Sequence, residues 1–203
     1  KKIIADFFEN RSRSILVIIS ITIGVFAVGM IGNGYILLTE GMAASYADNY
    51  PANITITTDP FDQDLVTMLA RQKNIEHVEG RQTILLEVRN PGETKWKKIY
   101  VTAIQDMANT RIKLLSPVGQ SFVLSDRSIA LLEDGNQEIN ALVDEPLEIK
   151  LKDGTTQMLP VAGIVKDYTA GREIIFESKR GYITADTLPY LHTPEHFTTL
   201  VIR

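Results

Sequence analysis

One apolar run dominates the hydropathy pattern near the start of the chain. Residues 15–38 read ILVIISITIGVFAVGMIGNGYILL and contain no charged side chain. An α-helix of this length would extend about 36 Å and could cross a hydrocarbon core of about 30 Å with some tilt. A secretory signal has a shorter apolar core, and buried helices of soluble proteins seldom run this long without a charge. We therefore predict a transmembrane helix at 15–38, with a cleaved signal and a buried helix as the alternatives.

The flanks of the run predict its orientation. Residues 1–14 carry four basic and two acidic side chains, and the next basic residue after the run is Arg71. Basic flanks of membrane helices stay in the cytoplasm. We expect a cytoplasmic N-terminus and an extracytoplasmic main domain, which places the protein in the cytoplasmic (inner) membrane.

Two sets of residues are expected to contact lipid or another helix. Ser20, Gly24, Gly29 and Gly32 are small enough for a second membrane helix to approach closely, although glycine is also common in membrane helices that have no partner. Residues 1–14 are expected to form a cytoplasmic amphipathic helix, with a frayed tail as the alternative. Its membrane-interface residues would be Ile3, Ile4, Phe7, Phe8, Arg11 and Arg13.

After the run the pattern changes from helical spacing to alternation. The helix is expected to extend to about residue 49, because Pro51 cannot continue it. Residues 53–59 alternate and are β-branched, which predicts a strand. Asp59-Pro60 is typical of an N-cap and a first-turn proline, so a helix should follow to about residue 74. Two further strands, 83–89 and 96–104, are expected on either side of the turn signal Asn90-Pro91-Gly92.

The rest of the chain predicts further short elements. Asp153-Gly154 lies between two alternating runs and is a strong hairpin signal. The order strand, short helix, strand then recurs at 181–184, 185–191 and 197–203, with shorter apolar elements before it at 128–132 and 173–177. Because the chain stops inside the last of these strands, we expect it to be an N-terminal part of a longer protein.

Charge and motif content argue against several functions. After residue 14 the chain holds 17 basic and 23 acidic residues and has no basic cluster, so we expect no nucleic-acid partner. It has no cysteine, no phosphate-binding loop and no G-x-S-x-G elbow. His192-Thr193-Pro194-Glu195-His196 matches an inverted zinc-peptidase pattern, but Pro194 would break the helix that this motif needs. We therefore predict a polar loop there, no metal, no cofactor and no catalytic residue.

The order of these segments resembles that of a known family. Asn10, Arg13 and Ser14, followed by Ile23-Gly24-Val25, resemble the first transmembrane segment of FtsX-like ABC transporter permeases. Residues 127–171 are similar to the inserted β-rich lobe of the MacB-type periplasmic core domain, and 181–191 to the strand and helix that follow it. One departure concerns residues 140–145, where the family carries glycines and this chain has none.

The resemblance implies an α+β fold and a role in transport. The domain at 50–203 would contain two β-α-β halves, with the inserted lobe at about 112–178. The family's permeases work as homodimers or heterodimers in the lipid bilayer with a partner ABC ATPase. They couple ATP hydrolysis to export, to lipoprotein or lipid extraction, or to signalling outside the membrane, in some cases with a periplasmic or cell-wall partner. The alternatives are a single-pass sensor or adaptor whose exported domain binds a ligand or partner protein and, less in keeping with the motifs, an exported hydrolase.

Overall fold

The computed structural model describes residues 11–105, 107–169 and 180–203, which fall into two units. Unit 1 comprises Lys1–Ser45 and unit 2 comprises Tyr46–Arg203. The expected cytoplasmic helix at 1–14 and the expected element at 173–177 lie largely or wholly outside the described residues.

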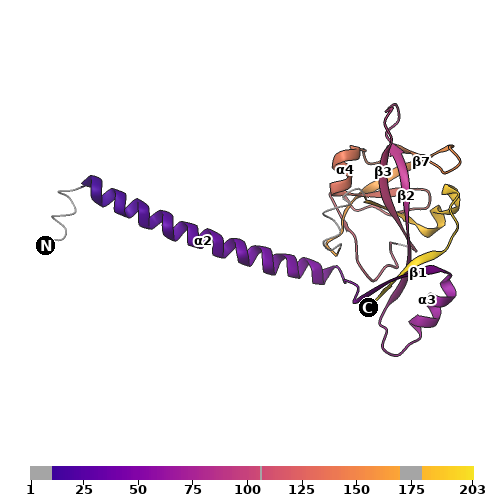
Figure 1. Ribbon diagram of the computed structural model, residues 1–203, viewed down its shortest axis with the longest axis horizontal. Coiled ribbons are helices and arrows are strands. Elements are labelled where there is room, and N and C mark those ends of the chain that lie inside the picture. Colours follow the sequence, from indigo (N-terminus) through magenta and orange to yellow (C-terminus); the bar gives the residue numbers. More distant parts are fainter. Residues whose placement is uncertain (1–10, 106, 170–179) are drawn as a thin grey trace. The chain divides into compact units, whose positions relative to one another are not determined.

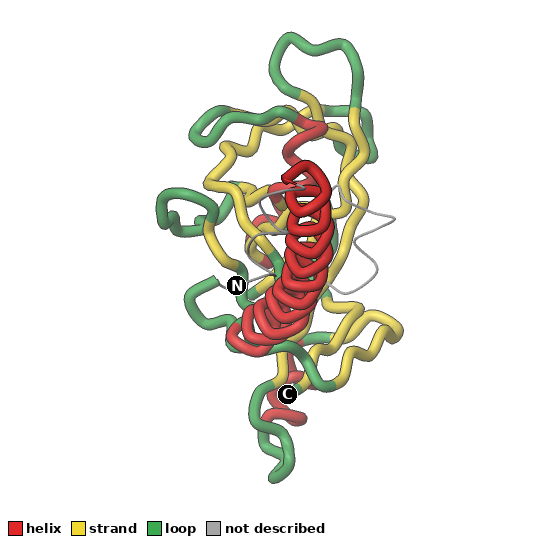
Figure 2. The backbone as a smooth tube through the Cα atoms, turned by 90° about the vertical axis from the view of Figure 1, so that its left-hand side faces the viewer, coloured by secondary structure: helices red, strands yellow, loops and turns green. Residues whose placement is uncertain are grey.

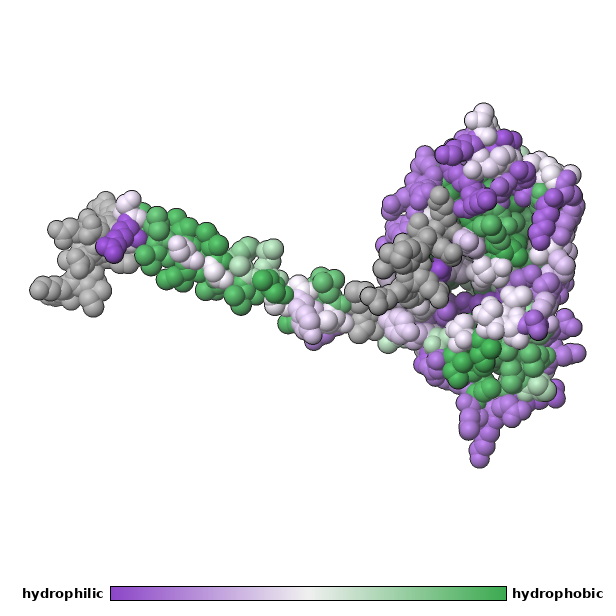
Figure 3. All heavy atoms as spheres, in the orientation of Figure 1, coloured by the Kyte–Doolittle hydropathy of each residue, from purple (hydrophilic) through white to green (hydrophobic). Residues whose placement is uncertain are grey.

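A single long helix, α2 (Arg11–Asp48), forms the described part of unit 1 and ends inside unit 2. Within the described chain it is the one helix long and apolar enough to cross a membrane. Its large apolar side chains are about half exposed or more, from Ile15 to Leu38. Figure 3 shows this apolar surface along the first part of the helix, with paler side chains towards its C-terminal end. Such a surface is stable in lipid, where the helix satisfies its own backbone groups.

Unit 2 is built on one mixed sheet with few helices. The first part comprises β1 (Ile54–Phe61), α3 (Gln63–Ala70), β2 (Val78–Arg89) and β3 (Lys97–Ile104). The middle part comprises β4 (Ser116–Pro117), β5 (Ile129–Leu132), α4 (Glu133–Ile139), β6 (Pro146–Lys150) and β7 (Thr156–Lys166). The last part comprises β8 (Arg180–Thr184), two 3₁₀ turns η2 (Ala185–Thr187) and η3 (Pro189–Leu191), and β9 (Phe197–Ile202). Figure 2 shows how little of unit 2 is helical.

Six strands close into a barrel. The pairs run from β2 to β3, β8, β5, β7 and β6, and β6 pairs back with β2. The β3–β8 and β5–β7 pairs are parallel, and the others in the ring are antiparallel. Alternate residues of these strands form the largest apolar core, which includes Val88, Ile99, Val101, Leu147 and Ile183. Three strands of the barrel, β2, β3 and β8, therefore lie outside the expected lobe at 112–178. The expected lobe and the two expected β-α-β halves are not separate sheets but contribute strands to the same barrel.

A smaller sheet extends from the first half of β2. There β9 pairs with β2 on one side and with β1 on the other. Helix α3 covers one face through a core of Val66, Phe197 and Leu200. Figure 1 shows β1 and α3 at one end of unit 2, whereas α4 lies at the other end beside β2, β3 and β7. Because β2 belongs to both the small sheet and the barrel, it joins the two ends of the domain.

The structure corrects one local prediction and confirms two others. Asp59 and Pro60 belong to β1, and α3 begins later, with Asp62 at its N-cap. Proline is tolerated in β1 because this is an edge strand. The predicted turns are present: Gly92 and Gly154 both have a positive φ, and the backbone amide of Leu151 donates to the carbonyl oxygen of Thr155.

Candidate functional site

The residues that follow α2 form a tightly held junction. Asn49 and Tyr50 come directly after the last helical residue, and Asn49 is buried. Tyr50 has φ 49°, a left-handed conformation that turns the chain out of the helix. We define the junction as Asn49–Tyr50 together with the residues that hold it.

The loop before β4 pairs with the junction as a short ladder. The backbone amide of Lys113 donates to the Tyr50 carbonyl oxygen at 2.7 Å, and that of Leu114 donates to the Asn49 carbonyl oxygen at 2.9 Å. The Ser116 hydroxyl donates to the Asn49 side-chain oxygen at 3.1 Å. Two backbone hydrogen bonds from the loop and one side-chain bond from the first residue of β4 therefore fix two consecutive residues.

Strand β9 holds the junction from a second direction. The backbone amide of Asn53 donates to the Ile202 carbonyl oxygen at 2.9 Å. The Arg203 guanidinium carbon lies 4.5 Å from the centroid of the Tyr50 ring. A guanidinium over an aromatic face is attractive and limits the ring's freedom. The junction is thus tied to the small sheet as well as to the loop.

Two side chains of β2 anchor the loop itself. The Glu79 carboxylate accepts hydrogen bonds from the backbone amides of Arg111 at 2.6 Å and Ile112 at 3.1 Å. Arg81 donates through Nη2 to Glu79 at 3.1 Å and to the Ile112 carbonyl oxygen at 2.6 Å. Both side chains of this ion pair are almost fully buried, so solvent screens the pair little. The loop is therefore fixed to the strand that joins the two ends of the domain.

A buried tyrosine lies close enough to Arg81 for the arginine's charge to affect it. Tyr182 of β8 donates its hydroxyl to Asp167 at 2.8 Å. Burial raises the pKa of Tyr182, the negative charge of Asp167 raises it further, and the nearby Arg81 opposes the shift. Tyr182 consequently stays a neutral hydrogen-bond donor in the physiological pH range.

The predicted packing residues lie apart from the junction in sequence and remain predictions. The Ser20 hydroxyl donates to the Leu16 carbonyl oxygen within α2. A Cβ atom built at Gly24, Gly29 or Gly32 would meet no other atom within 4 Å, so these positions have room for a partner helix. Arg11 and Arg13 lie in the first turn of α2, whereas Ile3, Ile4, Phe7 and Phe8 lie outside the described residues.

The two histidines of the zinc-like pattern have separate partners. His192 has φ 52°, ends η3, and contacts the Asp153 carboxylate at 3.0 Å. His196 lies just before β9 and contacts the Gln82 side chain at 3.3 Å. The segment between them has no helix, which confirms the predicted loop. Among the described residues no group of three or more His, Asp or Glu side chains could hold a metal ion.

Sequence reasoning missed the junction almost entirely. Its contacts join residues 49–50, 79–81, 111–116 and 203, which are distant in the chain. The one available signal was the pair Glu79 and Arg81, two opposite charges two residues apart, but they precede the strand predicted at 83–89, and only the structure extends β2 back to Val78.

Comparison with known proteins shows the fold. No model of a protein family matches the sequence, and no curated protein matches it. The extracellular domain of the noncanonic ABC-type transporter YknZ from Gram-positive bacteria is similar, with a TM-score of 0.53 and 12% identity over 73% of this chain and 81% of that one. The periplasmic region of MacB from Actinobacillus actinomycetemcomitans has a TM-score of 0.51 and 12% identity over 73% of this chain and 65% of that one.

Both similarities confirm the α+β fold that the resemblance implied. The chain spans about two thirds of the MacB region, and both matched structures are domains that lie outside the cytoplasm.

Proposed function

We propose that this chain belongs to the permease subunit of an ABC transporter. A partner ATPase would hydrolyse ATP in the cytoplasm, and the permease would use that energy for export, for lipoprotein or lipid extraction, or for signalling outside the membrane. The shared fold with extracytoplasmic domains of two ABC-type transporters supports this role. The chain lacks a phosphate-binding loop of its own, so the ATPase must be a separate domain or subunit. We propose no catalytic role for the chain itself.

The observation that carries the mechanism is the junction. Helix α2 is continuous from Arg11 to Asp48, and the next two residues are hydrogen-bonded to the loop before β4. A helix is stiff along its axis because every backbone hydrogen bond lies within it. A displacement of the helix end would therefore reach Asn49–Tyr50, then the loop, and through Glu79 and Arg81 the strand β2.

This proposal places the N-terminus in the cytoplasm and the domain outside it. It also requires a second membrane helix beside α2, supplied by a second permease copy or a related one. The packing residues Ser20, Gly24, Gly29 and Gly32 would lie at that contact. A periplasmic or cell-wall partner would bind the domain.

Loosening the junction tests the proposal. In the complete permease with its ATPase, the double substitution Asn49→Ala and Tyr50→Ala removes the bond to Ser116 and the ring under Arg203. Each lost contact contributes about 1 kcal/mol. We expect transport to fall severalfold while ATP turnover and membrane insertion persist.

The control is Gln137→Ala, an exposed position on α4. If the double variant transports as well as the control does, the side-chain contacts of Asn49 and Tyr50 do not transmit work. If the domain binds a ligand or partner with no ATPase dependence at all, the chain is a single-pass sensor or adaptor instead.

A further inference from the structure

A shallow groove runs along one side of α2, within the predicted transmembrane segment. Its volume is about 480 Å³. It opens where Gly29 and Gly34 leave the helix surface without side chains. The lining residues are Phe26, Gly29, Met30, Asn33, Gly34 and Leu37. The groove thus combines apolar side chains with one polar side chain, that of Asn33.

Asn33 carries the only amide side chain in the apolar run at 15–38. It makes no hydrogen bond to any described residue, whereas the Ser20 hydroxyl donates to the Leu16 carbonyl oxygen within the helix. Asn33 lies about 7.5 Å before the end of the run at Leu38, which is farther than its short side chain extends. An amide in hydrocarbon without a partner is costly. The position therefore favours a neighbouring membrane helix that offers Asn33 a hydrogen bond.

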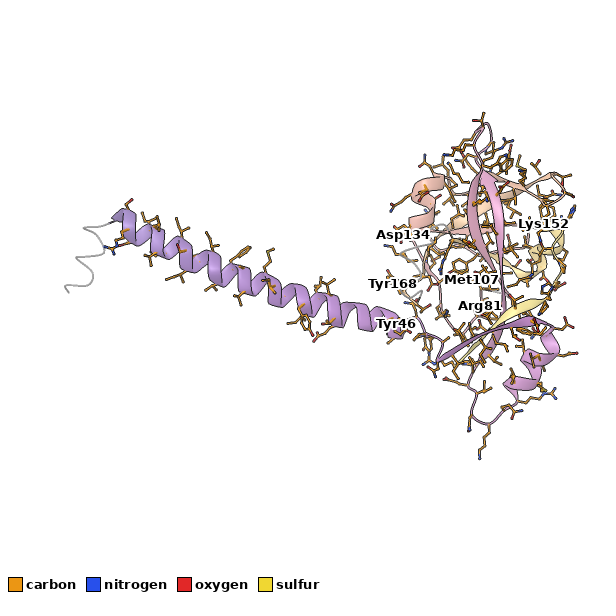
Figure 4. The ribbon with its side chains drawn as sticks, in the orientation of Figure 1. Tyr46, Arg81, Met107, Asp134, Lys152 and Tyr168 are labelled. Atoms are coloured by element: carbon orange, nitrogen blue, oxygen red, sulfur yellow. The ribbon has the colours of Figure 1, made fainter. Side chains whose placement is uncertain are left out.

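The side chains of the groove have the spacing of a contact between two helices. We define the seam as Phe26, Met30, Asn33 and Leu37. Its successive members are four, three and four residues apart, which is the alternation of the a and d positions in a coiled coil. Apolar side chains project from both sides of α2 in Figure 4, so hydropathy alone selects no face. The amide and the two flanking glycines, which let backbones approach closely, select this one.

We propose that the seam binds the seam of a second copy of this chain, in a parallel pair whose two Asn33 side chains hydrogen-bond to each other. An amide has both donors and an acceptor, so two copies related by a two-fold axis satisfy each other. A different helix would have to supply a polar side chain of its own at the same depth, and a lipid tail offers no hydrogen bond. A single asparagine in an apolar seam also fixes the register of two helices. The next position of the pattern is Glu40, whose carboxylate would face its own copy, so the contact ends at Leu37.

This inference rests on the proposed function in that α2 spans the membrane beside a second permease copy, and it refines the contact proposed there. At about 100° per residue, Gly24 lies about 180° around the helix from Asn33, and Ser20 about 140°. Both residues therefore face away from the seam and are available to a different membrane helix. Gly29 is the predicted packing residue that lies in the groove.

Cysteine cross-linking in membranes tests which face makes the contact. The chain has no cysteine, so Met30→Cys and Val28→Cys each introduce a single thiol. Val28 is similarly exposed but lies about 160° around the helix from Met30. Under copper-phenanthroline oxidation we expect Met30→Cys to form a disulfide-linked dimer severalfold faster than Val28→Cys, and two differently tagged copies identify the product. Equal cross-linking of the two variants overturns the seam.

Resonance energy transfer between full chains in lipid vesicles tests the amide. Fluorophores are attached at Ser12→Cys, an exposed position in the first turn of α2. Asn33→Leu keeps the helix apolar and should weaken dimerisation about three- to tenfold, since this is what one interhelical hydrogen bond contributes. Asn33→Gln keeps the amide and should retain most of the affinity.

The proposal fails if Asn33→Leu dimerises as tightly as the unsubstituted chain, because the amide is then unpaired across the contact. It fails as well if no dimer forms in vesicles while circular dichroism shows a folded chain, since Asn33 would then meet a different helix or the lipid surface. Neither measurement needs ATP or transport. A chain that pairs through the seam in a permease without any ATPase dependence would overturn the proposed function alone.

Discussion

At the scale of single residues, an asparagine and an aspartate adopt left-handed backbone conformations in the segment where the resemblance led us to expect glycines. Asn140 has φ 59° at the C-terminus of α4, and Asp144 has φ 68° a few residues later. The Asn136 side chain holds the first turn in place: its amide nitrogen donates to the Ala141 carbonyl oxygen, and its amide oxygen accepts from the Ala141 backbone amide. The chain therefore makes these two left-handed turns with asparagine and aspartate, which tolerate this conformation better than most residues.

Asp144→Gly should stabilise unit 2. Aspartate at φ 68° is strained, and its backbone amide bond to the Val161 carbonyl oxygen does not need the side chain. We expect the free energy of unfolding to rise by about 0.5–1 kcal/mol, since glycine removes the strain but gains entropy when unfolded. Thermal unfolding measures it, with Asp144→Ala as the control. If the glycine variant is less stable than the alanine variant, backbone strain at position 144 is not the cause of the effect.

Gly80→Ala should destabilise the small sheet. A Cβ atom at Gly80 would lie 2.5 Å from the Phe197 ring, in the core under α3. We expect a loss of about 1–3 kcal/mol from overpacking. The double variant Gly80→Ala, Phe197→Leu should recover part of the loss in chemical denaturation. If the double variant is no more stable than the single one, the contact is not the cause.

Thr155→Val should raise the pKa of Asp153. The Thr155 hydroxyl and amide both donate to the Asp153 carboxylate, and His192 contacts its other oxygen. These bonds, that of the hydroxyl above all, hold the pKa of Asp153 below its usual value. Because the folded pKa is lowered, the stabilisation is present at neutral pH and is lost as pH falls through that pKa. Carbon-detected NMR titration measures the pKa of Asp153, and Thr156→Val is the control. If the pKa of Asp153 is the same in Thr155→Val as in the unsubstituted chain, the Thr155 hydroxyl is not the main cause of the lowered pKa.

At the scale of elements, local signals predicted most of the helices and strands but not the strand pairing that closes the barrel. The apolar run, the alternation in β1 and the Asp153-Gly154 hairpin are properties of neighbouring residues, and all three are present in the structure. The closure of the barrel depends on β6 pairing with β2 about 60 residues earlier. The junction likewise joins four distant segments. No local pattern encodes such contacts, and Asp59-Pro60 was misread because an edge strand tolerates proline as well as a helix start does.

Ala44→Pro should separate ATP turnover from transport. Proline in the interior of α2 removes a backbone hydrogen bond, clashes with the preceding turn and costs about 3 kcal/mol. The apolar run at 15–38 stays intact, so insertion should not change. We expect transport by the complete permease to fall about tenfold or more while ATP hydrolysis continues, with Ala44→Leu as the matched control. Unchanged transport would argue against the helix as a rigid connection.

At the scale of the whole molecule, the absence of cysteine makes the membrane orientation directly testable. A single cysteine introduced at Ser12, or at the exposed Lys152 of the β6–β7 turn, would be the only thiol in the chain. With a membrane-impermeant maleimide on intact cells freed of any outer membrane, we expect Lys152→Cys to react and Ser12→Cys to react only after permeabilisation. Labelling in the reverse order would place the domain in the cytoplasm and exclude the proposed function.

The pairing of β1 with β9 sets the order in which this domain can assemble. β1 is made among the first residues after α2, yet its one neighbour in the sheet is the last strand described, about 140 residues later. While the intervening chain is being synthesised, β1 has no strand to pair with, and its backbone hydrogen-bonding groups remain unpaired. Contacts so far apart form late and slow folding. Folding of the domain therefore depends on prompt synthesis of β9, and any pause in synthesis before residue 197 would leave β1 with an unpaired edge that can associate with other chains.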